Sequence, residues 1–293
     1  MFSGLYTAII TPFLNDTIDE NAFAALIEEQ VAAGVAGIVP AGTTGESPTL
    51  DNREHLRVLE LAVKFAAGRI QVIAGTGANS TKEAIFLTQE AEKLGVDGTM
   101  QVTPYYNKPT QEGLFQHFSA IAAATDLPIM LYSVPGRSVI QIDSETAVRL
   151  AEQHSNIVSI KEAGGDPARV TELRAALGPD FSILCGDDPL TLPFIQNGAN
   201  GLVSVTSNLL PAEMNKMVNA CLSEDQDQAQ SEFDALLPLT SNLMGLAVNP
   251  LPIKEALALA GKCTDEFRLP LVNISESEKN TLTALLTEHN LIK

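Results

Sequence analysis

A lysine stands where an apolar segment gives way to a loop, in the stretch NIVSIKEAGG (156–165). Residues 157–160 are typical of a buried strand, and Lys161 follows them directly. Such a lysine commonly reaches the surface along its aliphatic chain, or pairs with a neighbour such as Glu162. Held in an apolar pocket instead, an amine loses its preference for the charged form. The neutral amine can then attack a carbonyl and form a Schiff base.

Groups that could move protons follow other apolar segments of the chain. They occur in AGTTGES (41–47), TPYYNKP (103–109), YSVPGR (132–137) and CGDD (185–188). A protonated imine draws electrons from the neighbouring carbon, so that this carbon can lose a proton and become a nucleophile. Phenols and hydroxyls joined by hydrogen bonds can carry such protons. The sequence therefore predicts carbonyl chemistry at a lysine, assisted by tyrosine and threonine.

Metal-dependent chemistry has little support in the sequence. The four histidines fall in segments typical of helices, and none follows an apolar strand: His55, His117, His154 and His289. Asp187 and Asp188 are adjacent carboxylates without a histidine, which is a weak pattern for a metal, and we expect them to cap the following helix. We expect no metal site and no cofactor.

The reactive residues need a scaffold that brings the ends of separate strands together. Segments of helical periodicity include NAFAALIEEQVAAG (21–34), for which we expect Asn21 as the cap. In STKEAIFLTQEAEKLG (80–95), Ser80 and Glu83 have the spacing of a capping box. Between such segments lie eight short apolar runs that are predicted to be strands: LYTAII (5–10), AGIVPAG (36–42), IQVIAGTG (70–77), GTMQVTP (98–104), LPIMLYSV (127–134), NIVSIKEA (156–163), FSILCGDD (181–188) and GLVSVTS (201–207).

This alternation predicts an α/β fold. Strands that alternate with helices pair in parallel, and eight units in about 210 residues favour a closed barrel. No G-x-G-x-x-G motif follows the first strand, which argues against a dinucleotide-binding fold. We expect a (β/α)8 TIM barrel over residues 1–224 and a C-terminal helical extension over residues 225–293. Because chemistry in such barrels lies at the carboxyl ends of the strands, the reactive residues should meet at one mouth.

The composition narrows the partners and the location. The net charge of −18 opposes binding to nucleic acid or to an anionic membrane, although a local positive site can still bind a small anion. No apolar segment reaches the roughly 18 residues of a membrane span, and MFSGLYTAIITPF (1–13) lacks the features of a signal peptide. Three cysteines, far apart and odd in number, are typical of free thiols. We therefore expect a cytoplasmic protein.

Three motifs resemble those of a known superfamily. GTTGE (42–46), YSVPGR (132–137) and IKEAGGD (160–166) are similar to segments of the pyruvate-dependent class I aldolases, which include N-acetylneuraminate lyase and dihydrodipicolinate synthase. The resemblance extends over essentially the whole chain. It is strongest to the synthases, through YSVPGR and MQVTPYYN (100–107), although Ser133 stands where those proteins carry asparagine.

The resemblance implies a role for each matching residue. Lys161 would form the Schiff base with pyruvate, and Tyr132 would donate and accept protons at the imine. Thr43 would connect Tyr132 to Tyr106, which would reach across a subunit interface into the partner's site. The implied substrate-binding residues are Thr44 for the pyruvate carboxylate, Arg137 for the carboxylate of the second substrate, and Gly186 and Val203 through backbone groups.

The implied reaction joins pyruvate to L-aspartate 4-semialdehyde and gives 4-hydroxy-tetrahydrodipicolinate, on the route to diaminopimelate and lysine, without an external cofactor. The implied assembly is a homotetramer, built as a dimer of dimers. Feedback inhibition by L-lysine is also expected. The residues that match its regulatory pocket are Ser47, His55, Asn79, Glu83 and Tyr105, whereas Asn52 and Pro48 depart from it.

Two other functions compete with this one. The first is a related aldolase or dehydratase that acts on a sugar acid or another keto acid. The second is a non-catalytic barrel that binds a small acid and regulates a partner. From the residues alone, Tyr132 is also compatible with a core aromatic, GTTGE with a tight turn, and Arg137 with a surface ion pair.

Overall fold

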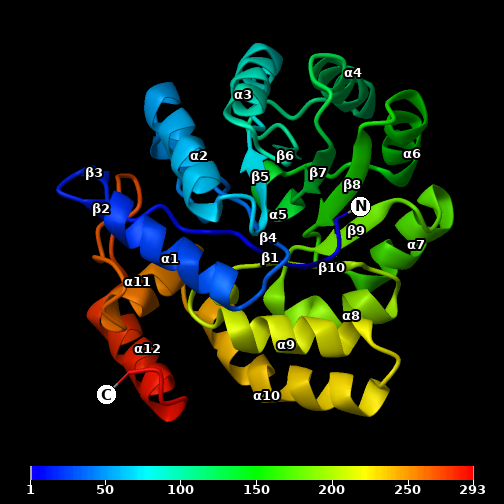
Figure 1. Ribbon diagram of the computed structural model, residues 1–293. Coiled ribbons are helices and arrows are strands. Elements are labelled where there is room, and N and C mark those ends of the chain that lie inside the picture. Colours follow the sequence, from blue (N-terminus) through cyan, green and yellow to red (C-terminus); the bar gives the residue numbers. More distant parts are fainter. Residues whose placement is uncertain (1, 293) are drawn as a thin grey trace.

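The computed structural model describes residues 2–292, so residues 1 and 293, the ends of the two expected regions, lie outside the described part. Eight parallel strands form a closed barrel, in which β1 pairs with both β4 and β10 (Figure 1). The strands are β1 (Gly4–Thr7), β4 (Gly37–Ile38), β5 (Gln71–Gly75), β6 (Gly98–Val102), β7 (Ile129–Ser133), β8 (Ile157–Glu162), β9 (Ser182–Cys185) and β10 (Gly201–Ser204). Each lies within one of the eight segments predicted from the sequence or begins one residue before it, so the predicted barrel is confirmed.

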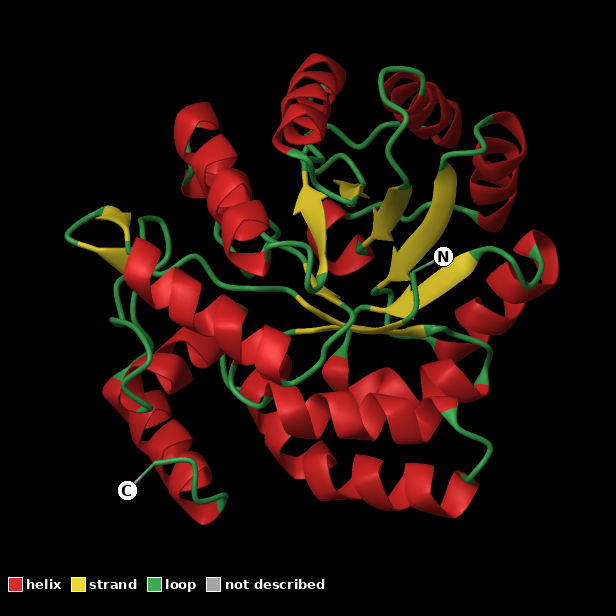
Figure 2. Cartoon of the chain, viewed as in Figure 1, coloured by secondary structure: helices red, strands yellow, loops and turns green. Residues whose placement is uncertain are grey.

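Helices surround the barrel, as the alternating pattern predicts (Figure 2). They are α1 (Glu20–Ala32), α2 (Asn52–Ala66), α3 (Thr81–Leu94), α4 (Gln111–Ala122), α6 (Ser144–Gln153), α7 (Pro167–Leu177), α8 (Thr191–Gln196) and α9 (Pro211–Leu222). Short helical turns lie in the loops after four strands: η1 (Ser47–Thr49), α5 (Pro135–Ser138), η2 (Asp188–Leu190) and η3 (Thr206–Asn208). None of the helices within residues 2–292 is both long and apolar enough to cross a membrane.

The C-terminal segment continues as three more helices: α10 (Gln226–Gly245), α11 (Leu251–Leu259) and α12 (Glu276–Glu288). Helix α10 packs along α9 (Figure 1). The chain breaks between α10 and α11 in the segment that contains NPLP (249–252), as expected. The division into residues 1–224 and 225–293 stays a prediction.

Two layers of apolar side chains result from the alternation of side chains along each strand. Side chains that point outward pack beneath the helices and form the main core. A second cluster fills the barrel interior and consists of Phe2, Tyr6, Ala8, Val39, Ile73, Met100, Met130, Tyr132, Val134, Leu184 and Val203. The interior is therefore packed with side chains, and a cavity can open only toward the mouth.

Several local predictions are wrong. Helix α1 is capped by Asp19, whose carboxylate accepts from Asn21 N–H, so Asn21 itself is not the cap. Ser80 occupies the cap position of α3, but its side chain makes no capping hydrogen bond, so the expected box with Glu83 does not form. A short hairpin, β2 (Phe13–Leu14) and β3 (Thr17–Ile18), was not expected.

Asp188 has a different role from the expected helix cap. Its fully buried carboxylate accepts hydrogen bonds from the backbone N–H groups of Val205 and Thr206, at 2.9 and 3.3 Å. Asp187 precedes η2 and makes no capping bond with its side chain. The carboxylate of Asp188 thus ties the end of β9 to the end of β10, a contact between strands that a local sequence pattern cannot reveal.

Candidate active site

Lys161 and Tyr132 are neighbours at the mouth of the barrel. They lie opposite each other in the register of β7 and β8, and each side chain is only 6% exposed. The Lys161 amine, Nζ, lies 4.3 Å from the centre of the Tyr132 ring. Strand geometry thus brings an amine and a phenol together without help from a loop.

Glu162 is not the partner of Lys161. Successive side chains on a strand point to opposite faces, and the Glu162 Oε1 atom accepts from Gly164 N–H at 2.7 Å. Burial raises the pKa of the Glu162 carboxyl, while this hydrogen bond and the Arg169 guanidinium act in the opposite direction. The Lys161 amine therefore faces the cavity without a salt bridge to its neighbour.

A cavity of about 350 Å³ opens above Lys161. It brings together six of the eight residues that we predicted for catalysis and substrate binding: Thr43, Thr44, Tyr132, Arg137, Lys161 and Gly186. Val203 lies deeper, in the cluster of the barrel interior, and Val205 lines the cavity instead. Tyr106 follows β6 in a loop, with a φ of 74° and a side chain that is 90% exposed, and it lines no cavity of its own chain described here.

Gly186 leaves room for the side chain of Lys161. A Cβ atom at this position would lie 2.7 Å from Ala163 Cβ and 3.0 Å from Lys161 Cε. The Gly186 N–H donates to Glu162 O at 2.9 Å, which fixes the loop after β9 against β8. The missing side chain at Gly186 therefore determines where the amine can lie.

Gly186→Ala should lower kcat/KM for pyruvate by about 10- to 100-fold, because the added methyl group displaces the amine from its attack position. Steady-state kinetics would measure the loss. Gly245→Ala is the matched control, since an added Cβ there meets no atom within 4 Å. Unchanged kinetics in Gly186→Ala would contradict this account of the cavity.

The loop that carries Thr43 and Thr44 is held by close backbone contacts. Gly75, at the end of β5, approaches so closely that a Cβ there would lie 2.4 Å from Ala41 O. Thr44 Oγ1 accepts from Asn249 Nδ2 at 3.1 Å. Asn249 lies in the connection between α10 and α11, so the C-terminal extension contributes directly to the site.

Arg137 lies on the short helix α5, on the rim of the cavity. Its Nη2 donates to Asn249 O at 3.0 Å, and the side chain is exposed. It also lines a second cavity, of about 330 Å³, together with Thr43, Ser47, Tyr105 and Leu271. A guanidinium between two cavities can donate hydrogen bonds to the carboxylate of a ligand that enters from solvent.

Some residues of the site were missed by the sequence analysis. Asp187 was expected to cap a helix, but it lines the cavity of Lys161; burial raises the pKa of its carboxyl, and the Lys161 charge acts in the opposite direction. Asn249 and its neighbour Val248 line both cavities. The interruption of helical periodicity at NPLP was the only sequence signal near them, and it indicated a break, not a function.

Two of the five residues of the expected regulatory pocket have contacts or charge effects with a third, Tyr105. Ser47 and Tyr105 line the second cavity, and Asn79 Nδ2 donates to Tyr105 O at 3.1 Å. Burial raises the pKa of the Tyr105 phenol, and the charge of Glu83 adds to this effect. His55 is buried in α2, where its Nε2 lies 2.8 Å from Gly75 O. Ser47 and Tyr105 thus line the second cavity, whereas Asn79 and Glu83 act on Tyr105 and His55 contacts Gly75, which also lines that cavity.

A parallel barrel with a buried lysine beside a tyrosine, both next to a cavity at the carboxyl ends of the strands, is typical of lyases that use a Schiff base. The model of the dihydrodipicolinate synthetase family matches residues 1–289. The chain belongs to this family. It is accordingly a lyase of the class I aldolase type, as the motifs implied.

Relatives and solved structures of synthases match this chain over nearly its full length. The 4-hydroxy-tetrahydrodipicolinate synthase of Geotalea daltonii is 48% identical over 292 residues and covers 100% of both chains. The solved structure of this synthase from Methylacidiphilum fumariolicum SolV has a TM-score of 0.97 and 49% identity, and covers 99% of this chain and 96% of that chain. A dihydrodipicolinate synthase from Cyanidioschyzon merolae with lysine bound has a TM-score of 0.95 and 40% identity, with 99% of each chain covered.

Proposed function

We propose that this chain condenses pyruvate with L-aspartate 4-semialdehyde to give 4-hydroxy-tetrahydrodipicolinate, through a Schiff base on Lys161. The observation that carries the proposal is the buried amine of Lys161, 4.3 Å from the Tyr132 ring, beside a cavity. The full-length relatives support the choice of reaction.

The Lys161 amine attacks the ketone of pyruvate and, with loss of water, gives a protonated imine. The Tyr132 phenol, whose ring centre lies 4.3 Å from the amine, would carry the protons of this step. Thr44, which lines the cavity and accepts a hydrogen bond from Asn249, would hold the pyruvate carboxylate. Loss of a methyl proton then gives the enamine, which is the carbon nucleophile.

The enamine carbon attacks the aldehyde of the second substrate, and the aldehyde oxygen becomes the hydroxyl of the product. The amino group of the new molecule then attacks the imine carbon, which closes the six-membered ring and releases the Lys161 amine. Arg137, on the rim between the two cavities, would hold the carboxylate of the semialdehyde. The guanidinium favours this substrate over a neutral sugar chain.

Borohydride reduction in the presence of pyruvate tests the covalent step. It should trap a pyruvyl adduct, which peptide mass mapping should place on Lys161. Parallel assays should detect condensation with L-aspartate 4-semialdehyde and no cleavage of sialic or ketodeoxy sugar acids. An adduct on another residue would overturn the mechanism, whereas sugar-acid cleavage would overturn only the choice of substrate.

We also propose that the site is completed by a second copy of the chain, in a dimer or in a tetramer of two such dimers. Tyr106 is 90% exposed, and the second cavity, lined by Thr43 and Tyr105, is open to receive a ring. Tyr106 of the partner subunit would enter there and extend the proton relay from Tyr132 through Thr43. We place the protein in the cytoplasm, since all three cysteines are free thiols.

Co-expression of Lys161→Ala chains with Tyr106→Phe chains tests the shared site. Each variant alone should be impaired, but a mixed dimer contains one site with both native side chains and should regain activity. The mixed assembly can be isolated with two affinity tags. No gain over the Tyr106→Phe homodimer would show that Tyr106 does not act in trans.

Inhibition by L-lysine is proposed for the region around Tyr105. The lysine-bound structure from Cyanidioschyzon merolae supports it, and the exposed carboxylate of Glu83 could accept an ammonium group. Millimolar lysine should reduce the rate of the native chain, and Glu83→Gln should abolish the effect. Absence of inhibition in the native chain would refute regulation, which the departures at Pro48 and Asn52 would then explain.

A further inference from the structure

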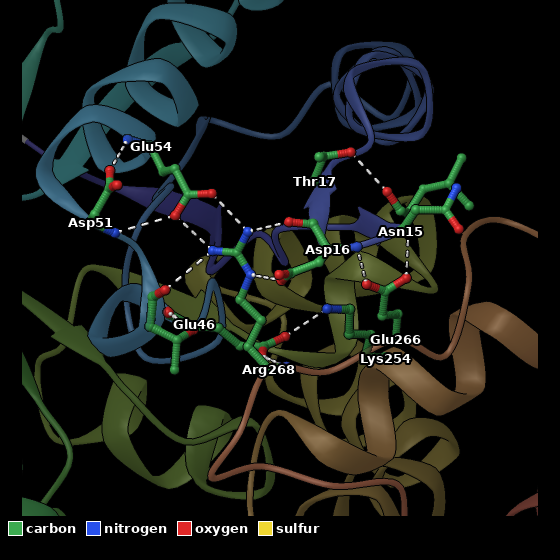
Figure 3. A network of polar contacts seen from close by, with 11 residues as sticks. Asn15, Asp16, Thr17, Glu46, Asp51, Glu54, Lys254, Glu266 and Arg268 are labelled. Atoms are coloured by element: carbon green, nitrogen blue, oxygen red, sulfur yellow. Dashed lines mark hydrogen bonds and ion pairs between the residues drawn. The ribbon is translucent and has the colours of Figure 1, made fainter.

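A buried ion pair joins the reactive loop to the C-terminal extension. Lys254 Nζ, in α11, lies 2.6 Å from Glu46 Oε1, and both side chains are fully buried. The Lys254 amine also lies 4.2 Å from the centre of the Phe13 ring, in the hairpin β2–β3. Arg268 N–H donates to the other oxygen of Glu46 at 3.3 Å (Figure 3). Glu46 is thus held from two points of the extension.

Such a pair is a poor means of stabilising a fold. The free-energy cost of moving two charged groups out of water can exceed the free energy gained from their mutual attraction. Replacement of a buried ion pair by apolar side chains is therefore often neutral or stabilising. Burial lowers the pKa of Lys254, against the raising effect of Glu46. The role of the pair is therefore better explained as structural specificity, because two charges at fixed positions favour one arrangement of the segments that carry them.

The geometry concerned is that of the GTTGE loop. Glu46 is the last residue of this loop, with a left-handed φ of 54° that is uncommon outside glycine. Its N–H donates to Thr43 O at 3.1 Å, so that the position of Glu46 is transmitted to the residue that lines both cavities. Thr44 is fixed separately through Asn249. The carboxylate of Glu46 is consequently the anchor of a strained turn.

We propose that Glu46 and Lys254 are positioning residues, whose ion pair sets the Thr43–Thr44 loop against Lys161 and Tyr132. This inference rests on the proposed function, because it assigns a task within the same reaction. Loss of the pair should let the loop move away from the mouth. The hydroxyl of Thr43 then leaves the proton relay, which lowers kcat, and Thr44 leaves the carboxylate of pyruvate, which raises KM.

Two variants separate this role from simple stabilisation. Lys254→Met removes the amine and leaves the Glu46 carboxylate buried without its partner, so the melting temperature should fall. The double variant Glu46→Gln with Lys254→Met has no buried charge at this position, and its melting temperature should return toward the native value. Both should lose about 10- to 100-fold in kcat/KM for pyruvate, since neither restores the anchor.

Lys279→Met is the matched control. Lys279, in α12, pairs with Glu255 of α11, whose carboxylate is as deeply buried as that of Glu46. The ion pairs of Lys279 are with Glu255 and Asp265 and do not involve the GTTGE loop. Lys279→Met should lower the melting temperature and leave kcat and KM unchanged. This variant shows what instability alone does to the kinetics.

Kinetics and melting temperatures of the three variants, beside the native chain, decide the proposal. Reduced kcat and raised KM in the double variant, with its stability restored, would support it. Native kinetics in the double variant would overturn it. If instead the native chain forms no borohydride adduct with pyruvate, the proposed function fails, and that failure is distinct because it appears before any substitution at Glu46 or Lys254.

Discussion

Lys161→Ala should lower the rate of condensation by at least about 10³-fold and abolish the pyruvyl adduct. Loss of a covalent nucleophile removes the reaction path itself, and effects of this size are typical of such substitutions. Lys161 forms no ion pair with Glu162, so its removal breaks no salt bridge there, and the Asp187 carboxyl in the same cavity loses only a charge that lowers its pKa. The folded state should therefore persist, and the loss should be chemical.

The measurement combines steady-state rates with borohydride trapping and a thermal melt. Lys216→Ala is the control, since Lys216 lies on α9 with a side chain that is 66% exposed and pairs with Glu232 at the surface. It should keep native kinetics and native trapping. Persistent trapping in Lys161→Ala would assign the Schiff base to another amine.

Tyr132→Phe should lower kcat by about 10²- to 10⁴-fold, the usual contribution of a positioned acid–base group. The substitution keeps the ring beside the Lys161 amine and removes only the hydroxyl. Because the ring still fills its place in the interior cluster, the melting temperature should change little. Stopped-flow traces of imine formation should show that the chemical step itself is slowed.

Tyr6→Phe is a matched control for this experiment. Tyr6 is the other buried tyrosine of the same interior cluster, and its hydroxyl donates to Gln71 at 2.5 Å, away from the cavity. Burial raises the pKa of Tyr6 to about 12. Its loss should affect stability and leave kcat unchanged. Equal kinetic effects of the two substitutions would remove the case for Tyr132 as the proton carrier.

The strands and their order could be predicted from the sequence because the information is local. Apolar runs such as 127–134 and 156–163 fill both faces of a strand, and the helical segments between them force parallel pairing. Parallel strands then place all their carboxyl ends at one mouth. For this reason the sequence alone predicts that Lys161 and Tyr132, on adjacent strands, lie close together.

Details of the site depended on contacts that are distant along the chain. The partners Asn249 and Thr44 are 205 residues apart, and Lys254 and Glu46 are 208 apart. No periodicity connects such positions. The wrong cap at Asn21 and the missing capping bond of Ser80 have a similar cause at short range, because such side chains have several possible backbone partners and the surrounding packing decides which one is used.

The sequence by itself determined the class of chemistry and the barrel, because residue types and apolar spacing are enough to specify strands, helices and the residues at strand ends. Only the tertiary structure decided how the reactive loop is held, through a C-terminal extension that reaches back to Thr44, Glu46 and Arg137. It also decided that Tyr106 lies outside its own cavity. These features arise from packing between segments that are distant along the chain. The free energy of such packing depends on the whole folded chain, so no local sequence pattern predicts it.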